Sequence, residues 1–424
     1  MNTRTYTLLV FLQLLFFAGC KNTVQQDTLQ KQQVNTQDKI VSVTGIILAQ
    51  SDELEIGKNK TLTAAVIPAT ATNKKVTWTS SDPNVIALNS TTDTVVTLNA
   101  IAKQVGKTAV ITATSEDGNK TASCIVTVTH IKVPYSELER YLENSASATE
   151  VNYIEVTGNI PVSDLIGSYD TSKRLGTSSA FGKKFNDTPT KRVALKLPHI
   201  AEENRDMSFC FYKCSSLVKV ENLPQTVTNM ESCFESCSNL TDIPALPEKV
   251  NKLSNCFLKC EALTKASITA EYATMMDGCF YGCTKLQEVA ITSESIHSME
   301  DCFTNCENLQ KILSLPNKAV NWYQCFSNCS NLKELPAIPA TANNIQFCFA
   351  DCSALTSVTL NCDYDHLTDK KEAFDKCFSL NDGSIKVPEA FYDNYTTTNA
   401  LQEMAIPGDT TEERRAKFAT IKQD

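Results

Sequence analysis

The chain has 424 residues, of which 42% are hydrophobic and 21% are charged. This composition is sufficient to bury a core and excludes a chain that is disordered throughout, while the length predicts two or three domains. Lysine and arginine number 39 against 48 aspartates and glutamates, and the resulting net charge of −9 argues against a protein that grips nucleic acid through a basic face.

The first twenty residues have the pattern of an export signal. Arg4 supplies a positive charge, and residues 8–17 form an apolar run that is too short to cross a bilayer but typical of a signal peptide. Small residues directly precede Cys20, and the segment Phe-Ala-Gly-Cys resembles the lipobox of bacterial lipoproteins. The resemblance implies that Cys20 is acylated and that the chain is anchored to the outer membrane and exposed at the cell surface. The alternative is an ordinary cleaved signal peptide with an incidental cysteine.

Residues 21–39 follow the export signal and are rich in Gln, Asn, Thr and Lys, with few apolar groups. We expect a flexible tether that holds the next unit on the order of 25 Å from the membrane surface. No later segment of the sequence is apolar enough to predict a membrane span.

Residues 40–130 show short alternating runs of apolar and polar residues without helical periodicity. Turn signals such as Gly118 separate the runs, and about seven strands in roughly 90 residues predict a β-sandwich. Trp78 lies in a run that we expect to be a central strand, with its indole filling the core between the sheets. Cys124 has no partner cysteine within this unit. The unit resembles the bacterial immunoglobulin-like domain, group 2, in residues 54–57, 62–68, 71–82, 106–114 and 124–128. That family implies a surface spacer and, in some members, an adhesive domain.

Two sets of cysteines recur with one constant period in the second half of the chain. The first set is Cys210, Cys233, Cys256, Cys279, Cys302, Cys325 and Cys348, and the second is Cys214, Cys237, Cys260, Cys283, Cys306, Cys329 and Cys352. Both frame the motif C-F-x-x-C, with leucine three residues after the second cysteine, and an eighth copy around Phe374 follows a two-residue insertion. A fixed period in the range of about 20 to 29 residues, with a leucine skeleton, predicts a leucine-rich-repeat-like solenoid.

The apolar residues within one repeat predict its local structure. Met207, Cys210, Phe211, Cys214 and Leu217 are spaced 3, 1, 3 and 3, which predicts one face of a helical turn. A short strand is expected after the leucine, and a proline often ends the coil. A single coil leaves an apolar stripe uncovered, so we expect eight stacked coils rising about 4.8 Å each and spanning about 40 Å.

The motif F-x-x-C-x-x-L-x-x-[VI] over about residues 195–392 resembles the BspA-type leucine-rich repeats of bacterial surface proteins. The resemblance implies cell-surface adhesion, with binding to host matrix proteins in some members, and it transfers no catalytic residue. Alanine usually precedes the phenylalanine in that family, as Ala373 does here, whereas seven copies have cysteine. The fold class predicted for the chain is multidomain: an all-β immunoglobulin-like sandwich followed by a leucine-rich-repeat solenoid of 23-residue repeats.

The ends of a solenoid need covers, because the outer coils lack a neighbour. We expect residues 131–206 to form an N-terminal cap with a degenerate first repeat, with a helix at 136–142, a strand at 154–156 and further segments at 162–166 and 193–198. The repeats follow over residues 207–392. Residues 409–412 resemble a capping box that opens a helix through Ile421, so residues 393–424 are expected to be a C-terminal cap helix.

The periodic cysteines allow three interpretations. They form a ladder of small buried hydrophobes, which Ala373 in the place of a first cysteine supports. Alternatively they form disulfides, which an exported chain permits, although cysteines at i and i+4 of a helix lie about 5–6 Å apart and seven per column leave one unpaired. Zinc is the third interpretation, but C-x3-C is not the finger spacing and no histidine accompanies it. Residues 362–366, Cys-Asp-Tyr-Asp-His, also have ligating side chains, and a solvated acidic turn is expected there.

The main functional hypothesis is a lipid-anchored surface interaction protein, an adhesin that acts as a monomer. Its partner is expected to be a host extracellular-matrix or surface protein, or a glycan. Solenoids bind macromolecules through extended faces. The candidate binding face consists of polar positions around the predicted strands, namely Lys219, Glu221, Asp242, Lys265, Glu288, Lys311, Glu334 and Ser357.

The alternative hypothesis is a carbohydrate- or nutrient-capturing module of an envelope complex, with Tyr212, Tyr281 and Tyr323 as exposed residues for stacking on sugar rings. No enzyme is expected, because the four histidines are isolated and no catalytic motif is present. We also expect no cofactor, no metal and no nucleic-acid partner.

Overall fold

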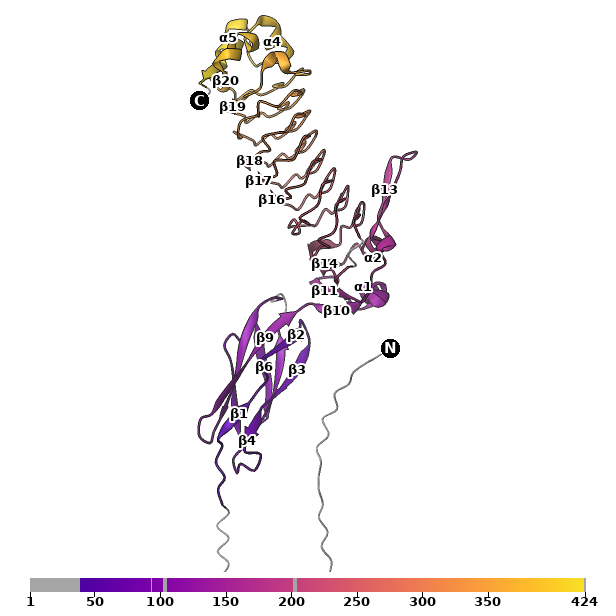
Figure 1. Ribbon diagram of the computed structural model, residues 1–424, viewed down its shortest axis with the longest axis vertical. Coiled ribbons are helices and arrows are strands. Elements are labelled where there is room, and N and C mark those ends of the chain that lie inside the picture. The colour runs from indigo at the N-terminus through magenta and orange to yellow at the C-terminus, as the bar shows by residue number, and fades with distance from the viewer. Residues whose placement is uncertain (1–38, 93, 102–104, 201–203, 423–424) are drawn as a thin grey trace, which may run out of the picture.

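The computed structural model describes residues 39–92, 94–101, 105–200 and 204–422. A β-sandwich comes first along the chain and a single stack of coils follows, so that the two parts lie end to end (Figure 1). The predicted fold class, a sandwich followed by a repeat solenoid, is confirmed. Within the described ranges no helix is long and apolar enough to cross a membrane. Cys20, the expected signal peptide and most of the expected tether lie outside the described residues.

In its described residues the sandwich has two sheets and one short extra pair of strands. The sheets have the orders β2-β9-β8-β5 and β3-β7-β6, and β1 pairs with β4. The bounds are β1 (Gly45–Ile47), β2 (Ser51–Glu55), β3 (Asn59–Thr63), β4 (Ala65–Ile67), β5 (Val76–Ser80), β6 (Ile86–Thr92), β7 (Val95–Ala100), β8 (Thr108–Ser115) and β9 (Thr121–Thr129). The alternating run at residues 61–66 is divided between β3 and β4, which take part in different pairings.

Alternating burial along the strands forms the core of the sandwich. Strand β8 alternates exposed or half-buried residues with buried ones, and its inward residue Ile111 is fully buried. Trp78 is 8% exposed and belongs to this core, as expected. Its position in the sheet was predicted wrongly, because β5 is an edge strand that pairs only with β8. Cys124 is a buried free thiol.

His130 alone separates the last strand of the sandwich from the first strand of the solenoid cap, β10 (Ile131–Pro134). The cap builds the parallel sheet β10-β11-β14-β15, which leads directly into the first coil. Its elements are η1 (Tyr135–Glu137), α1 (Leu138–Asn144), β11 (Val151–Thr157), η2 (Val162–Leu165), β12 (Ser168–Asp170), β13 (Leu175–Thr177), α2 (Ala180–Asn186), β14 (Arg192–Lys196) and β15 (Leu217–Glu221). The projecting hairpin β12–β13 was not predicted (Figure 1).

We define the coils from the methionine-like column, as residues 207–229, 230–252, 253–275, 276–298, 299–321, 322–344, 345–369 and 370–392 for coils 1 to 8. Their strands after β15 are β16 (Lys265–Ile268), β17 (Glu288–Ile291), β18 (Lys311–Ser314), β19 (Val358–Thr359) and β20 (Ile385–Pro388). Coils 2 and 6, both fully described, contain no assigned strand. Each has a proline, Pro244 or Pro336, at the same register, and proline cannot donate to a parallel ladder.

The corner of each coil differs from the helical turn that the spacing predicted. Residues 207–214 and their equivalents form consecutive turns, and the chain adopts a positive φ twice per coil, at the equivalents of Phe209 and Lys213. Backbone N–H groups there alternate in their acceptors. Ser232 N and Phe234 N donate to the next coil, whereas Cys233 N donates within its own turn. The corner therefore combines tight turns with a ladder to its neighbour, which an isolated helix would not form.

The phenylalanines form a continuous buried stack along the solenoid. Consecutive rings from Phe211 to Phe374 have centroids 5.3–5.8 Å apart, and the central pairs are within 8° of parallel. All of these rings are fully buried. Each ring therefore covers the apolar face of the coil beside it, as the stacking interpretation requires.

Both columns of periodic cysteines are buried free thiols, which supports the packing interpretation. The two columns differ in their hydrogen bonds. Each second-column thiol from Cys237 to Cys377 donates to the phenylalanine carbonyl of the preceding coil at 3.0–3.2 Å. Among the described residues, no first-column thiol donates such a bond. This difference explains why alanine replaces a first-column cysteine at Ala373 while the second-column Cys377 is present.

We predict that Cys260→Ala destabilises the protein by about 1 kcal/mol more than Cys256→Ala does. Both substitutions remove the same atoms from fully buried sites of adjacent columns. Only Cys260 donates to a carbonyl, that of Phe234, at 3.1 Å. Denaturant unfolding of the two variants measures the difference, and equal losses of stability would show that the thiol bond is energetically neutral.

Helix α2 takes the place of a coil before coil 1. Cys214 Sγ donates to Gly182 O at 3.3 Å, as later cysteines of its column donate to a coil, and the Phe181 ring lies 5.6 Å from that of Phe211. A Cβ atom at position 182 would lie 1.9 Å from the Cys210 carbonyl oxygen, so only glycine permits this approach. The cap thus supplies the acceptor and the ring that coil 1 lacks.

The C-terminal cap is not the single helix that we predicted. After η3 (Tyr364–His366) in coil 7 and η4 (Glu389–Phe391) in coil 8, the chain forms α3 (Tyr392–Tyr395), α4 (Thr398–Glu403), α5 (Thr411–Ala416) and β21 (Phe418–Ile421). The capping box exists, but one residue later, between Thr410 and Glu413. Helix α5 ends at Ala416 because the chain then pairs in parallel with β20. The segment after α4 also covers coil 8, since Phe374 N donates to Met404 O.

Candidate binding surface

Seven of the eight predicted binding residues form one column on the strand side of the solenoid. They are one repeat apart and occupy the same register in coils 1 to 7: Lys219, Asp242, Lys265, Glu288, Lys311, Glu334 and Ser357. Glu288 and Ser357 are half-buried, and the others are exposed. Glu221, the eighth, lies two residues further along β15 and is also half-buried. We call the column of seven the charge column.

The charges of this column alternate in sign from coil to coil. Lys265 and Lys311 are both register partners of Glu288, and their Nζ atoms lie 3.2 and 3.7 Å from its carboxylate. In coil 1, Lys219 Nζ lies 2.8 Å from Glu221, and this hydrogen bond raises the pKa of Lys219. Such exposed pairs contribute little to stability. The column therefore presents fixed charges of both signs without a strong net field.

A second column, two residues further along each strand, carries no charge in coils 2 to 6. It consists of Pro244, Ser267, Ala290, Leu313 and Pro336. Leu313 is 52% exposed, although its neighbours in the column are small. The first four of these residues, from Pro244 to Leu313, and the chain around Ile243 line an open hollow of about 580 Å³. Sequence reasoning missed this hollow, although the period-2 alternation of the strands placed the second column on the same face.

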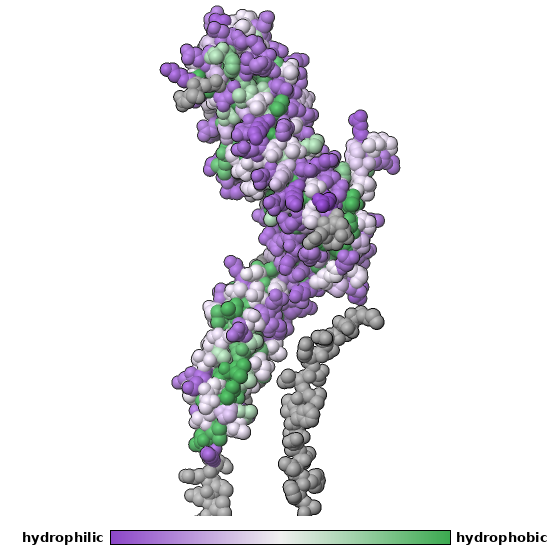
Figure 2. Space-filling view, viewed as in Figure 1, coloured by the Kyte–Doolittle hydropathy of each residue, from purple (hydrophilic) through white to green (hydrophobic). Residues whose placement is uncertain are grey.

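The surface differs between the two parts of the molecule. In the view of Figure 2, hydrophilic residues predominate over the solenoid, whereas hydrophobic residues gather in patches on the sandwich. Val110 and Ile125, which are register partners on β8 and β9, are 38% and 50% exposed.

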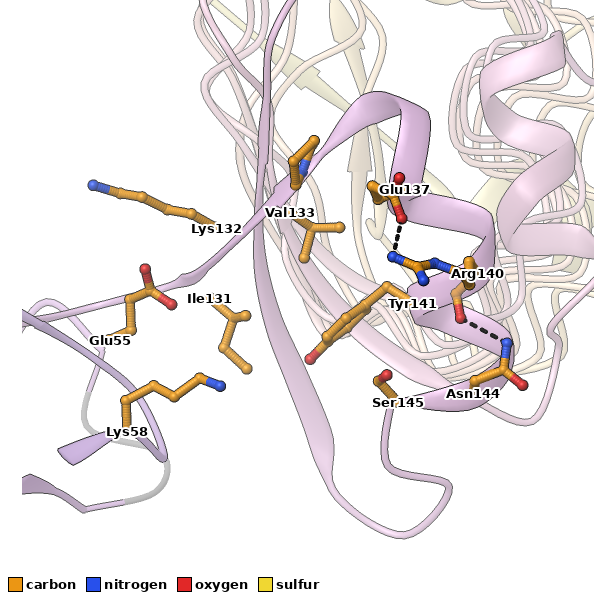
Figure 3. A pocket seen from close by; sticks show the side chains of 11 residues that line it. Glu55, Lys58, Ile131, Lys132, Val133, Glu137, Arg140, Tyr141, Asn144 and Ser145 are labelled. Carbon is orange, nitrogen blue, oxygen red and sulfur yellow. Dashed lines mark hydrogen bonds and ion pairs between the residues drawn. The ribbon is translucent and has the colours of Figure 1, made fainter.

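An open cleft of about 670 Å³ lies where the sandwich meets the cap (Figure 3). Glu55 and Lys58 of the sandwich face Tyr141 and Arg140 of α1 across it, and Arg140 is already paired with Glu137. Burial, and secondarily the charge of Glu55, raises the pKa of Tyr141. The lining contains no arrangement of nucleophile, base and orienting group.

The other residues that the sequence singled out are not brought together. Tyr212 is buried and Tyr281 and Tyr323 are half-buried, so the expected exposed tyrosine platform is wrong for Tyr212. Cys362 is buried, with its Sγ 3.3 Å from the Tyr395 hydroxyl. The solvated-turn interpretation thus fails for Cys362, because α3 packs over it. No group of three or more His, Cys, Asp or Glu residues in the described chain is placed to hold a metal ion.

His130 is the most buried of the histidines in the structure, at the joint between the two parts. Burial lowers its pKa, and the carboxylate of Glu221, 3.9 Å away, opposes this shift. Its ring packs near that of Tyr153 at 6.2 Å. These contacts give it a structural position between the sandwich core and the first solenoid strands.

Together these features define a leucine-rich-repeat solenoid joined to an immunoglobulin-like domain, two modules that typically bind rather than catalyse. Residues 206–333, 253–381 and 320–420, in six copies, match the BspA type leucine rich repeat region. The matched ranges together cover half of the chain, which therefore belongs to the BspA-type leucine-rich-repeat family. Residues 42–126 match the bacterial Ig-like domain, group 2.

Similar proteins share only parts of this chain. An Ig-like virion protein of Serratia phage KSP90 is 42% identical over 90 residues, which are 21% of this chain and 33% of that protein. An uncharacterized protein of Clostridium acetobutylicum is 36% identical over 92 residues, 22% of this chain and 9% of that protein. The chain thus spans a third or less of the length of these relatives.

Among solved structures, a leucine-rich-repeat protein of T. pallidum is 16% identical, with a TM-score of 0.34, covering 59% of this chain and 98% of that one. A leucine rich cell surface protein of Faecalibacterium prausnitzii is 17% identical, with a TM-score of 0.20, covering 62% of this chain and 96% of that one.

Proposed function

We propose that this protein is a lipid-anchored adhesin that displays its solenoid at the bacterial surface and binds a host or partner macromolecule there. The observation that carries the proposal is the charge column, in which six charged residues lie in one register on the strand side of a stacked solenoid. The stacked coils fix the backbone positions of these residues at a regular spacing, which favours recognition of an extended partner.

The order of the parts supports display away from the membrane. Acylation of Cys20, in the lipobox-like segment, attaches the chain, residues 21–39 serve as a tether, and the immunoglobulin-like domain acts as a spacer. The structure then has the sandwich and the solenoid end to end (Figure 1). The solenoid is therefore the part farthest along the chain from the anchor, and we propose that it works as a monomer on the outer membrane.

Binding to immobilised matrix proteins tests the proposal. The chain carrying Cys20→Ser is compared with a variant in which Lys265, Glu288 and Lys311 are all replaced by glutamine. We expect at least one matrix protein to bind the parent chain and to lose about tenfold or more in affinity with the variant. The three residues are surface groups, so folding is expected to be unaffected.

A matched control removes another surface ion pair. Asp170 and Lys173 lie 3.2 Å apart on the hairpin, away from the strand side, and Asp170→Asn with Lys173→Gln is expected to leave binding unchanged. Absence of binding to every matrix protein, or equal losses in both variants, would contradict the proposal.

The carbohydrate-capturing alternative is less favoured by the structure. One of its three tyrosines, Tyr212, is buried against Phe209 with ring centroids 5.8 Å apart. The same variants on a glycan array decide between the two, because binding of glycans with no binding of matrix proteins would favour the alternative.

A further inference from the structure

We infer that the hollow beside the charge column is the anchor point for an extended segment of a partner polypeptide, one that presents a large aliphatic side chain and a lysine or arginine on the same face. This inference rests on the proposed function, since it names the part of the strand side that carries the binding energy. The hollow is a different part of the strand side from the charge column, whose residues the sequence already indicated.

The hollow forms because strand pairing and side-chain size on the strand side vary from coil 2 to coil 5. In coil 2, Pro244 prevents a regular strand, so the chain at residues 243–246 lies beside β16 without joining its sheet. Ser267 and Ala290 then contribute only small side chains on β16 and β17. Leu313 on β18 stands at the far side, 52% exposed. The result is a depression of about 580 Å³ between an aliphatic wall in coil 2 and an aliphatic wall in coil 5.

The lining specifies an aliphatic occupant. Ile243, Leu246 and Leu313 contribute branched side chains, and smaller apolar groups come from Pro244, Ala245, Ala266 and Ala290. None of the residues that line the hollow is aromatic, so it lacks the flat ring on which a sugar or a nucleic-acid base stacks. An exposed apolar cluster on a face of otherwise charged residues marks an interaction site. A single large side chain buried there would act as an interface anchor.

The charges at the rim specify the neighbour of that side chain. Lys265 lies at the rim but is engaged by Glu288 at 3.2 Å. The Asp242 carboxylate is exposed, and within the described chain its one hydrogen bond comes from the hydroxyl of Thr241, at 2.8 Å. Lys219 of coil 1 attracts this carboxylate but is paired with Glu221 instead, so Asp242 is the rim group without an ion-pair partner in the described chain. A basic residue beside the aliphatic anchor complements it.

A polypeptide in extended form satisfies both requirements at once. Adjacent side chains of an extended segment point in opposite directions and next-but-one side chains lie about 7 Å apart. The hollow and Asp242 lie on one face, so the aliphatic and basic residues are expected two positions apart or at the two sides of a slight turn.

Selection from a phage-displayed library of random peptides of about 12 residues tests the inference without a known partner. The target is the full chain with Cys20→Ser, and the two test variants are Leu313→Ser and Asp242→Asn. Leu175, which is 44% exposed on the hairpin, provides the matched control Leu175→Ser. Thermal unfolding of each variant checks that the fold is intact.

We expect enrichment of peptides that pair Leu, Ile or Met with Lys or Arg. Their affinity should fall about tenfold or more with Leu313→Ser and about fivefold with Asp242→Asn, and remain unchanged with Leu175→Ser. Failure to enrich any peptide, or enriched peptides that bind Leu313→Ser as tightly as the parent chain, would overturn the inference.

The two proposals fail in different ways. If peptides behave as expected but no matrix protein binds, the hollow is a binding site and the adhesin proposal is wrong. If a matrix protein binds through the charge column and is unaffected by Leu313→Ser, the adhesin proposal stands and the hollow is not its anchor point.

Discussion

Replacing Phe280 with alanine is expected to lower the free energy of unfolding by about 3–5 kcal/mol. Its ring is fully buried and stacks between those of Phe257 and Phe303, with centroids 5.7 and 5.6 Å away. The substitution creates a cavity at the interfaces with both neighbouring coils. Since coils contact mainly their neighbours, the loss weakens the solenoid on both sides of coil 4. Guanidinium unfolding followed by circular dichroism measures the effect.

Phe378 provides the control for this substitution, because it is the same residue type at 75% exposure in coil 8. Phe378→Ala is expected to change stability by less than about 0.5 kcal/mol. If Phe280→Ala cost no more than its exposed counterpart, the stack of phenylalanines would not be what holds the coils together.

The cysteines of the native protein are expected to react at least about a thousandfold more slowly than those of the unfolded chain. All seventeen described thiols are buried. Burial raises the pKa of Cys210, Cys283 and Cys352 to about 12 from an ordinary value of 9.0. The thiolate is the reactive form, and a raised pKa makes it rarer at a given pH. At about pH 8, this shift alone lowers the thiolate fraction about a thousandfold, and lack of access adds to it.

A chromogenic disulfide reagent, applied with and without about 6 M guanidinium, measures this difference. An introduced surface thiol, Ser267→Cys, serves as the control, because position 267 is exposed and the reagent should label it promptly. Rapid labelling of most cysteines in the native chain would contradict the buried columns.

The repeat itself could be read from the sequence because its period is constant. The unchanging spacing fixes which side chains meet in neighbouring coils, so the phenylalanine and cysteine columns followed directly. The conformation of each corner did not follow. Spacings of 3, 1, 3 and 3 suit both a helical turn and two consecutive tight turns. Tight turns are favoured because backbone N–H groups such as Phe234 N donate to the next coil, in this case to Cys256 O. Local sequence spacing does not predict this contact between coils.

The C-terminal cap shows the same limit. A capping box predicts where a helix begins, and the Glu413 carboxylate does accept a hydrogen bond from Thr410 N. No residue near Ala416 predicts where that helix ends. The end is set by the pairing of Phe418 with Ile385, which lies far back along the chain. Long-range pairing of this kind is invisible to periodicity.

Part of the candidate site could be predicted from the sequence and part could not. The charge column could be predicted because it depends only on register. The hollow beside it could not, because it depends on the volumes of Ser267, Ala290 and Leu313 in three coils together and on the interruption at Pro244. The pairing of Lys265 with Glu288 also required the structure.

The alternation of charge along the column makes the sign of neighbouring residues depend on how many coils lie between them. Loss of coil 4 alone would place Lys265 beside Lys311, and like charges directly opposite one another in a sheet are destabilising. Loss of coils 4 and 5 together would instead place Lys265 beside Glu334 and keep opposite signs in contact. Removal of an even number of coils within coils 1 to 6 therefore preserves the alternation of charge along the column, whereas removal of an odd number brings like charges together.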